Sequence, residues 1–109
     1  MPDERQRRLA LNESAFRVAN DRMESWPERR ERTDRASFYC ECADLDCRER
    51  IRMTPGEYEH VRSNSRQFAV VPGHELLDVE NVIERADGYV IVEKTAGVTP
   101  LVERSDPRN

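Results

Sequence analysis

Residues 38–47 read Phe38-Tyr39-Cys40-Glu41-Cys42-Ala43-Asp44-Leu45-Asp46-Cys47 and contain all three cysteines of the 109-residue chain. The spacing C-x-C-x4-C concentrates a rare residue type and favours a soft metal ion, zinc first. The aromatic pair predicts a short strand over residues 37–42, on which residues two apart share a face. The thiols of Cys40 and Cys42 then point the same way, and the turn-forming residues 43–46 return Cys47 to the same ion.

A fourth ligand must come from elsewhere, because structural zinc usually takes four ligands. The chain has two histidines, His60 and His74. His74 follows Pro72-Gly73, a turn that can aim the next side chain at a neighbouring loop, since proline fixes φ and glycine permits a positive φ. His60 lies in an expected helix and projects away from the apolar side of that helix. The sequence therefore predicts His74 as the fourth ligand, with His60 as the alternative.

Other interpretations of the three thiols stay open: an iron–sulfur centre, a redox thiol pair, or reduced cysteines without a metal. The odd number of cysteines and the lack of an apolar run near the N-terminus favour a cytoplasmic location, where thiolates remain reduced. No segment approaches the length that a membrane-spanning helix needs.

Composition predicts one domain with a modest core, since 37% of the residues are hydrophobic and another 37% are charged. Such a small domain gains stability from a bound metal. Residues 1–35 contain 9 basic and 8 acidic residues, and residues 36–109 contain 9 basic and 14 acidic ones. The net charge of −4 does not favour a nucleic-acid partner.

Residues 3–32 predict a charged amphipathic helix, with Pro27 at the end of its apolar series. Asn12 fills a gap in this stripe, which otherwise consists of Leu9, Phe16, Ala19, Met23 and Trp26. The stripe packs either on the protein's own sheet or on a partner helix, such as that of a second copy, where a lone asparagine can set the register. Residues 28–35 alternate in charge and predict a solvated connector.

The remaining segments predict strands around one short helix. Residues 48–53 alternate as a strand with Arg48, Arg50 and Arg52 on one face, either solvated or contacting an anion or a partner. Thr54, Pro55 and Glu57 form a capping box that opens a helix. Residues 68–71 predict a central strand. Residues 79–86 fit a strand or a helix, and Asp87-Gly88 before the strand at 89–92 favours a hairpin.

Residues 9–94 contain a series of short motifs: Asn12-Glu13…Phe16-Arg17…Asn20…Arg22, Phe38-x-Cys40-Glu41-Cys42-x4-Cys47, Glu57-Tyr58-Glu59…Val61-Arg62, Phe68-x-Val70…Pro72-Gly73-His74-Glu75 and Val92-Glu93-Lys94. Together they resemble a family of small uncharacterised bacterial proteins of the actinobacterial type. The resemblance implies no activity. It does link Cys40, Cys42, Cys47 and His74 as one constellation.

The sequence thus predicts an α+β fold: a long N-terminal helix, then a small, mostly antiparallel sheet with one short helix, stapled by a metal site. Residues 1–35 form the helix and connector, residues 36–104 the metal-stapled domain, and residues 105–109 a frayed tail.

The leading functional prediction is a zinc-binding interaction or regulatory module with a structural Cys3His site. Its predicted partner is another protein or a second copy bound through the N-terminal helix. Neither a nucleic acid nor a membrane is expected as a partner. Two alternatives remain. One is a small metalloenzyme with an open zinc position and Glu41 or Glu75 as base. The other is a nucleic-acid-binding zinc module that uses the three arginines and Tyr39.

Overall fold

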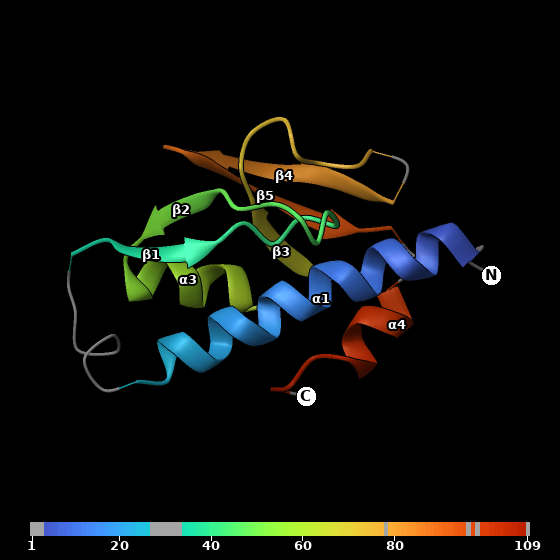
Figure 1. Cartoon of the computed structure of the whole chain (residues 1–109), viewed down its shortest axis with the longest axis horizontal. Helices are drawn as coiled ribbons and strands as arrows, with labels where there is room; N and C mark the ends of the chain where they lie inside the picture. Colours follow the sequence, from blue (N-terminus) through green and yellow to red (C-terminus); the bar gives the residue numbers. More distant parts are fainter. Residues whose placement is uncertain (1–3, 27–33, 78, 96, 98, 109) are drawn as a thin grey trace.

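The computed structural model describes residues 4–26, 34–77, 79–95, 97 and 99–108. It confirms the α+β fold, with a long N-terminal helix followed by small antiparallel sheets and short helices (Figure 1). In chain order the elements are α1 (Glu4–Glu24), β1 (Ala36–Tyr39), β2 (Arg50–Met53), α3 (Pro55–Arg62), β3 (Gln67–Val70), β4 (Glu80–Ala86), β5 (Tyr89–Lys94) and α4 (Thr99–Arg104).

The strands form two separate antiparallel sheets. One consists of β1 and β2, and the other has the order β3-β5-β4. The central strand β5 is buried along most of its length, because its two faces belong to two different apolar clusters. Val90 and Val92 pack in the cluster that contains Cys40 and Cys42. Tyr89 and Ile91 pack on the other side with residues of β1, β2 and α3.

Local sequence signals set several element boundaries as predicted. Thr54 caps α3: its hydroxyl accepts a hydrogen bond from Glu57 N, and the Glu57 carboxylate accepts one from Thr54 N. Gly88 has φ of 87° in the turn between β4 and β5. Residues 80–86 are therefore the first strand of a hairpin rather than a helix.

The strand prediction for residues 37–42 is wrong at its end, because β1 stops at Tyr39. Cys40 N still donates a hydrogen bond to Glu49 O over 3.3 Å, just beyond the last paired residues of the two strands. Glu41 N then donates to Ala69 O over 2.8 Å, and this contact leads the chain from the first sheet to β3. The segment is thus shared between two sheets, which is why it leaves the strand register.

The N-terminal helix does not bury the predicted apolar stripe. Its fully buried positions are mostly polar: Ala10, Glu13, Ser14, Arg17 and Asn20. Phe16 and Ala19 are half-buried, and Trp26 is 56% exposed. The surface beneath α1 offers ionic and hydrogen-bonding partners to these polar side chains, and apolar contacts to Ala10. The helix ends at Glu24, and the predicted continuation over residues 27–32, like most of the connector, lies outside the described residues.

Two buried charge clusters hold α1 against the rest of the chain. The Lys94 ammonium on β5 donates to a carboxyl oxygen of Glu13 and to one of Glu80, so one cation serves two buried acids. The Arg62 guanidinium on α3 donates to Asp21 on α1 and to Asp106 near the C-terminus. Buried ions need such partners, because an unpaired charge away from water is strongly destabilising. These pairs fix how α1 lies across both sheets.

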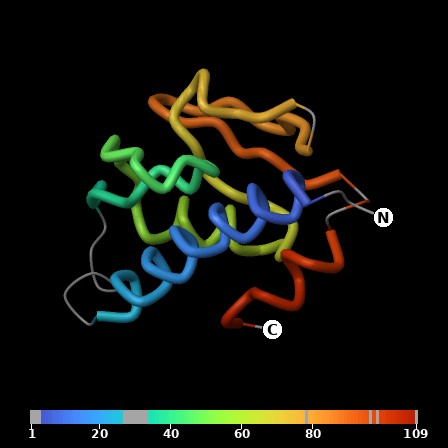
Figure 2. Tube along the Cα trace, turned by 45° about the vertical axis from the view of Figure 1, so that its right-hand side comes forward, coloured from blue at the N-terminus to red at the C-terminus, as the bar shows by residue number. Residues whose placement is uncertain are grey.

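The C-terminal segment is more ordered than its sequence indicates. Residues 99–104 form α4, which lies beside α1 in both views (Figure 1, Figure 2). Asp106 is buried and paired with Arg62, although residues 105–109 were expected to fray. The helix was missed because its short stretch has one buried apolar residue, Val102, and no helical period to detect. None of the described helices has the length and apolarity needed to cross a bilayer.

We predict that Glu13 makes stability fall as pH rises. Burial, with Glu80 close by, raises the pKa of Glu13 well above its ordinary value of 4.5, although Lys94 opposes this. Over the window above 4.5 the unfolded chain has lost this proton while the folded chain keeps it, so each increase in pH favours unfolding. In Glu13→Gln the free energy of unfolding should fall less between about pH 5 and about pH 8 than in the wild type.

Chemical denaturation at the two pH values measures this difference. Glu4→Gln, an exposed change on the same helix, is the control and should follow the wild type. Parallel pH curves for wild type and Glu13→Gln would show that Glu13 is ionised in the folded state.

Candidate metal centre

The cysteine loop is held in place by the polar face of α1. Asn20 clamps the backbone of Tyr39, with Tyr39 N donating to its side-chain oxygen over 2.8 Å and its amide nitrogen donating to Tyr39 O over 3.0 Å. Two turns earlier on the helix, the Asn12 side chain donates to Ala43 O over 2.9 Å. These two asparagines thus grip the chain on either side of Cys40 and Cys42. The helix fixes the backbone from which two of the thiols project.

A tight turn returns Cys47 to the other two thiols. Cys47 N donates to Asp44 O over 3.0 Å, and Asp46 N donates to the Asp44 carboxylate over 2.9 Å. This side-chain bond is typical of an aspartate that begins a turn. The prediction that residues 43–46 reverse the chain is therefore confirmed.

His74 is aimed at the thiols by the Pro-Gly turn, as the sequence predicts. His74 N donates to Val71 O over 2.9 Å, and Gly73 has φ of 96°. Proline at the second position and a positive φ at the third are the features of a type II turn, where a residue other than glycine would be strained. The turn follows β3, so His74 comes from the end of a strand of the second sheet, whereas the cysteines follow β1 of the first.

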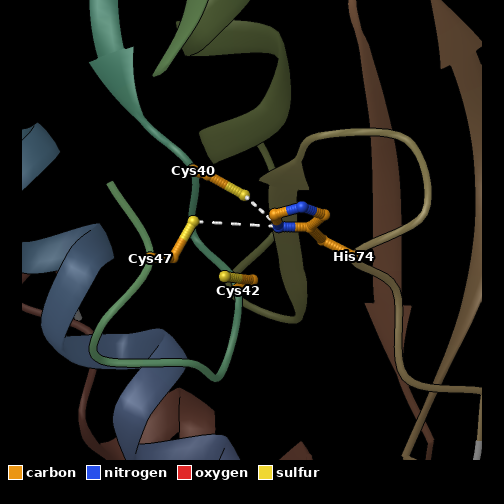
Figure 3. Close-up of side chains that lie close together, drawn as sticks. All are labelled: Cys40, Cys42, Cys47 and His74. Atoms are coloured by element: carbon orange, nitrogen blue, oxygen red, sulfur yellow. Dashed lines mark hydrogen bonds between the residues drawn. The ribbon is translucent and has the colours of Figure 1, made fainter. Parts of the chain in front are cut away.

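Three thiols and one imidazole meet between the two sheets (Figure 3). The donor atoms of Cys40, Cys42, Cys47 and His74 all lie within 4.8 Å of one another. The His74 Nδ1 atom lies 3.6 Å from Cys40 Sγ and 3.8 Å from Cys47 Sγ. A tetrahedral ion with bonds of about 2.3 Å to sulfur and about 2.0 Å to nitrogen separates these atoms by about 3.5 Å. The four donors can therefore hold one metal ion.

Two further contacts support this arrangement. The His74 Nε2 atom lies 2.6 Å from Glu49 Oε2, so this carboxylate can keep the proton on Nε2 and leave Nδ1 to bind a metal. Val71 N donates to Cys40 Sγ over 3.2 Å, which stabilises negative charge on that sulfur. Ligating histidines commonly have such a carboxylate on the second nitrogen.

The thiols influence one another's ionisation. The hydrogen bond with Cys40 lowers the pKa of Cys42 to about 5, and the same bond, together with burial, raises the pKa of Cys40. Burial raises the pKa of Cys47, and the hydrogen bond with Cys42 raises the pKa of His74. Negative charge therefore concentrates on Cys42, next to the one group in the cluster that can become cationic.

His60, the alternative ligand, lies elsewhere. It is exposed on α3, and its Nε2 atom is 3.1 Å from the Glu84 carboxylate on β4. Both histidines thus have a carboxylate neighbour, but only His74 faces the thiols.

The two carboxylates considered as bases have other roles. Glu41 is fully buried, and its carboxylate accepts hydrogen bonds from Asn20 and Ala69 N over 2.8 and 3.0 Å. Burial raises the pKa of Glu41. The Glu75 carboxylate accepts a hydrogen bond from Gly73 N over 2.7 Å within the turn. Both side chains therefore support the backbone around the centre.

The three arginines of the predicted basic face are all exposed. Arg48 donates to the carbonyl oxygens of Leu45 and Cys47, and so braces the cysteine loop. The Arg50 guanidinium lies 4.0 Å from the centre of the Tyr39 ring. Arg52, at the other end of β2, donates to Arg35 O. Only the first two lie beside the metal centre.

The sequence does not reveal the supporting residues. Glu49 belongs to no motif, and the family resemblance that includes Asn12 and Asn20 gives them no role at the cysteine loop. An asparagine inside a helical apolar stripe was the one available indication, and it pointed to a partner helix rather than to the cysteine loop.

Comparisons of the chain with protein-family models, with curated proteins and with solved structures find no match. The fold and the centre therefore define its class by themselves: a small α+β protein with a Cys3His cluster that can hold a metal ion.

We predict that the two histidine–carboxylate pairs differ in their effect on metal affinity. Titration with Co²⁺, followed by its absorption bands, should show affinity reduced about 10–100-fold in Glu49→Ala and more in His74→Ala. The matched changes Glu84→Ala and His60→Ala should leave affinity unchanged. Equal affinities for His74→Ala and His60→Ala would contradict the assignment of His74.

Proposed function

We propose that this protein is a zinc-binding interaction module in which one zinc ion has a structural role. The observation that supports it most is the gathering of four donors within 4.8 Å of one another, with the two His74–cysteine distances close to those around a tetrahedral ion. Three thiolates and one imidazole are a common ligand set of structural zinc. Such thiolates need a reducing compartment, which supports a cytoplasmic location.

A structural role accounts for this ligand set better than a catalytic one. Catalytic zinc usually has three protein ligands and an open position, whereas four protein donors fill a tetrahedral ion. Three thiolates also give the centre a net charge of about −1, which weakens zinc as a Lewis acid. Glu41 and Glu75, the two candidate bases, are engaged with the backbone.

Zinc would add a coordinate link between two sheets that otherwise meet through a shared apolar cluster. The strands β1 and β2 are four residues each and share no ladder with the second sheet. A metal between the cysteine loop and His74 ties the first sheet to the end of β3. Because the site exists only in the folded chain, the free energy of binding the metal adds to the free energy of folding.

An interaction role is supported by the surface beside the centre. The half-buried flank of α1 and the arginines of residues 48–50 border one groove that is open to solvent. Open apolar surface with charged borders is typical of sites where another protein binds. The two contact surfaces expected from the sequence, the helix and the arginine-bearing strand, thus lie next to each other.

We predict that the purified chain contains one zinc ion and that removing it lowers the melting temperature by more than about 10 °C. Elemental analysis before and after chelation establishes the metal content, and scanning calorimetry gives the melting temperature. His60→Ala should behave like the wild type, because His60 lies outside the cluster. An unchanged melting temperature after verified metal removal would contradict the proposed role.

A further inference from the structure

A groove runs between α1 and the residues that flank the cysteine loop, and it has a volume of about 500 Å³. Its floor is apolar or aromatic and its charged residues are both cationic; the lining residues are Ala15, Phe16, Ala19, Tyr39, Cys47, Arg48 and Arg50. We name it the arginine groove. Leu11, one helical turn before Ala15, is 45% exposed and extends the apolar wall.

The positive charge of the groove is not neutralised by the contacts that hold its arginines. Arg48 is bound by backbone carbonyl oxygens, and Arg50 lies over an aromatic ring. Both guanidinium groups are exposed and keep donors available. The groove therefore suits a ligand that combines apolar and acidic groups.

The chain itself carries such a ligand beside the groove. Leu45 is 53% exposed at the tip of the turn and stands between two exposed acidic residues, Asp44 and Asp46. We name residues 44–46 the acidic loop. The leucine side chain suits the apolar floor of the arginine groove, and the two carboxylates suit its two guanidinium groups.

We propose that the protein forms a two-fold dimer in which the acidic loop of each copy occupies the arginine groove of the other. A two-fold interface requires that one face carry both complementary parts. The acidic loop leads directly into Cys47 and Arg48 of the groove, so both parts share one face. Each dimer then contains the same contact twice.

The acidic loop also makes the face selective for a second copy of the chain over other partners. A nucleic acid or an acidic peptide could pair with Arg48 and Arg50 but would offer no cation to Asp44 and Asp46. A second copy brings its own Arg48 and Arg50 to these carboxylates. The mixed charge of this face therefore favours the protein's own surface.

This inference rests on the proposed interaction role and extends it to the metal. The acidic loop lies between Cys42 and Cys47, and Cys47 also lines the groove. A bound zinc ion fixes both ends of the loop, so metal-loaded protein should dimerise more tightly than metal-free protein.

Sedimentation velocity of the zinc-loaded chain, from micromolar to millimolar concentration, tests the proposal. We expect a monomer–dimer equilibrium that Leu45→Ser weakens at least about tenfold. Leu77→Ser is the matched control, because Leu77 is 71% exposed outside the two surfaces, and it should leave the equilibrium unchanged. Elemental analysis of the same samples keeps the two proposals apart: a zinc-loaded monomer at all concentrations overturns the dimer and leaves the zinc module standing.

A charge exchange tests which surfaces meet. Arg50→Glu and Asp46→Arg should each weaken the dimer, and their mixture or the double variant should restore it, since a carboxylate then faces a guanidinium in each contact. Circular dichroism checks that each variant is folded. A dimer that responds equally to Leu45→Ser and Leu77→Ser, or a double variant as weak as both single ones, would overturn the proposal.

Discussion

The cluster of three thiols and one imidazole is the point at which the segments leaving the two sheets converge, beside the apolar cluster through which the sheets pack. The first sheet ends at Tyr39 and continues into the cysteine loop, while the second sends its chain from β3 into the turn that carries His74. Near the centre the backbone link is the bond from Glu41 N to Ala69 O. Four donors on one ion would join the loop and the turn at a single point, with geometry that the turns have already set.

The long helix α1 positions this centre through a buried side that is mostly polar, while its apolar side is only half-buried. Its buried side is polar, so α1 is held by directional contacts: Asn12 and Asn20 hold the cysteine loop, and Glu13 and Asp21 hold β5 and α3. Directional contacts permit one register of the helix, whereas apolar packing tolerates several. The half-buried apolar side is then left at the edge of the arginine groove. The helix thus positions the centre and also borders the surface that a partner would meet.

What the sequence predicts well is local. The capping box at Thr54, the Asp87-Gly88 hairpin and the turn before His74 each depend on a few adjacent residues, and all three are confirmed. Gathering the four donors was also predictable, because spacing brings the cysteines together and a single turn aims the histidine. The orientation of α1 could not be predicted, because the pair of Glu13 and Lys94 is 81 positions apart in the sequence. No hydrophobic periodicity indicates such a long-range pair. The same holds for Arg62 and Asp106, which order the C-terminal segment.

X-ray absorption at the zinc edge of the purified protein tests the central claim most directly, because it counts the sulfur and nitrogen atoms bound to the metal. We expect three sulfur atoms at about 2.3 Å and one imidazole nitrogen at about 2.0 Å. The spectrum of His74→Ala should lose the imidazole contribution and keep the three sulfurs. Fewer than three sulfurs, or an exchangeable water in place of the imidazole in the wild type, would contradict a closed structural site.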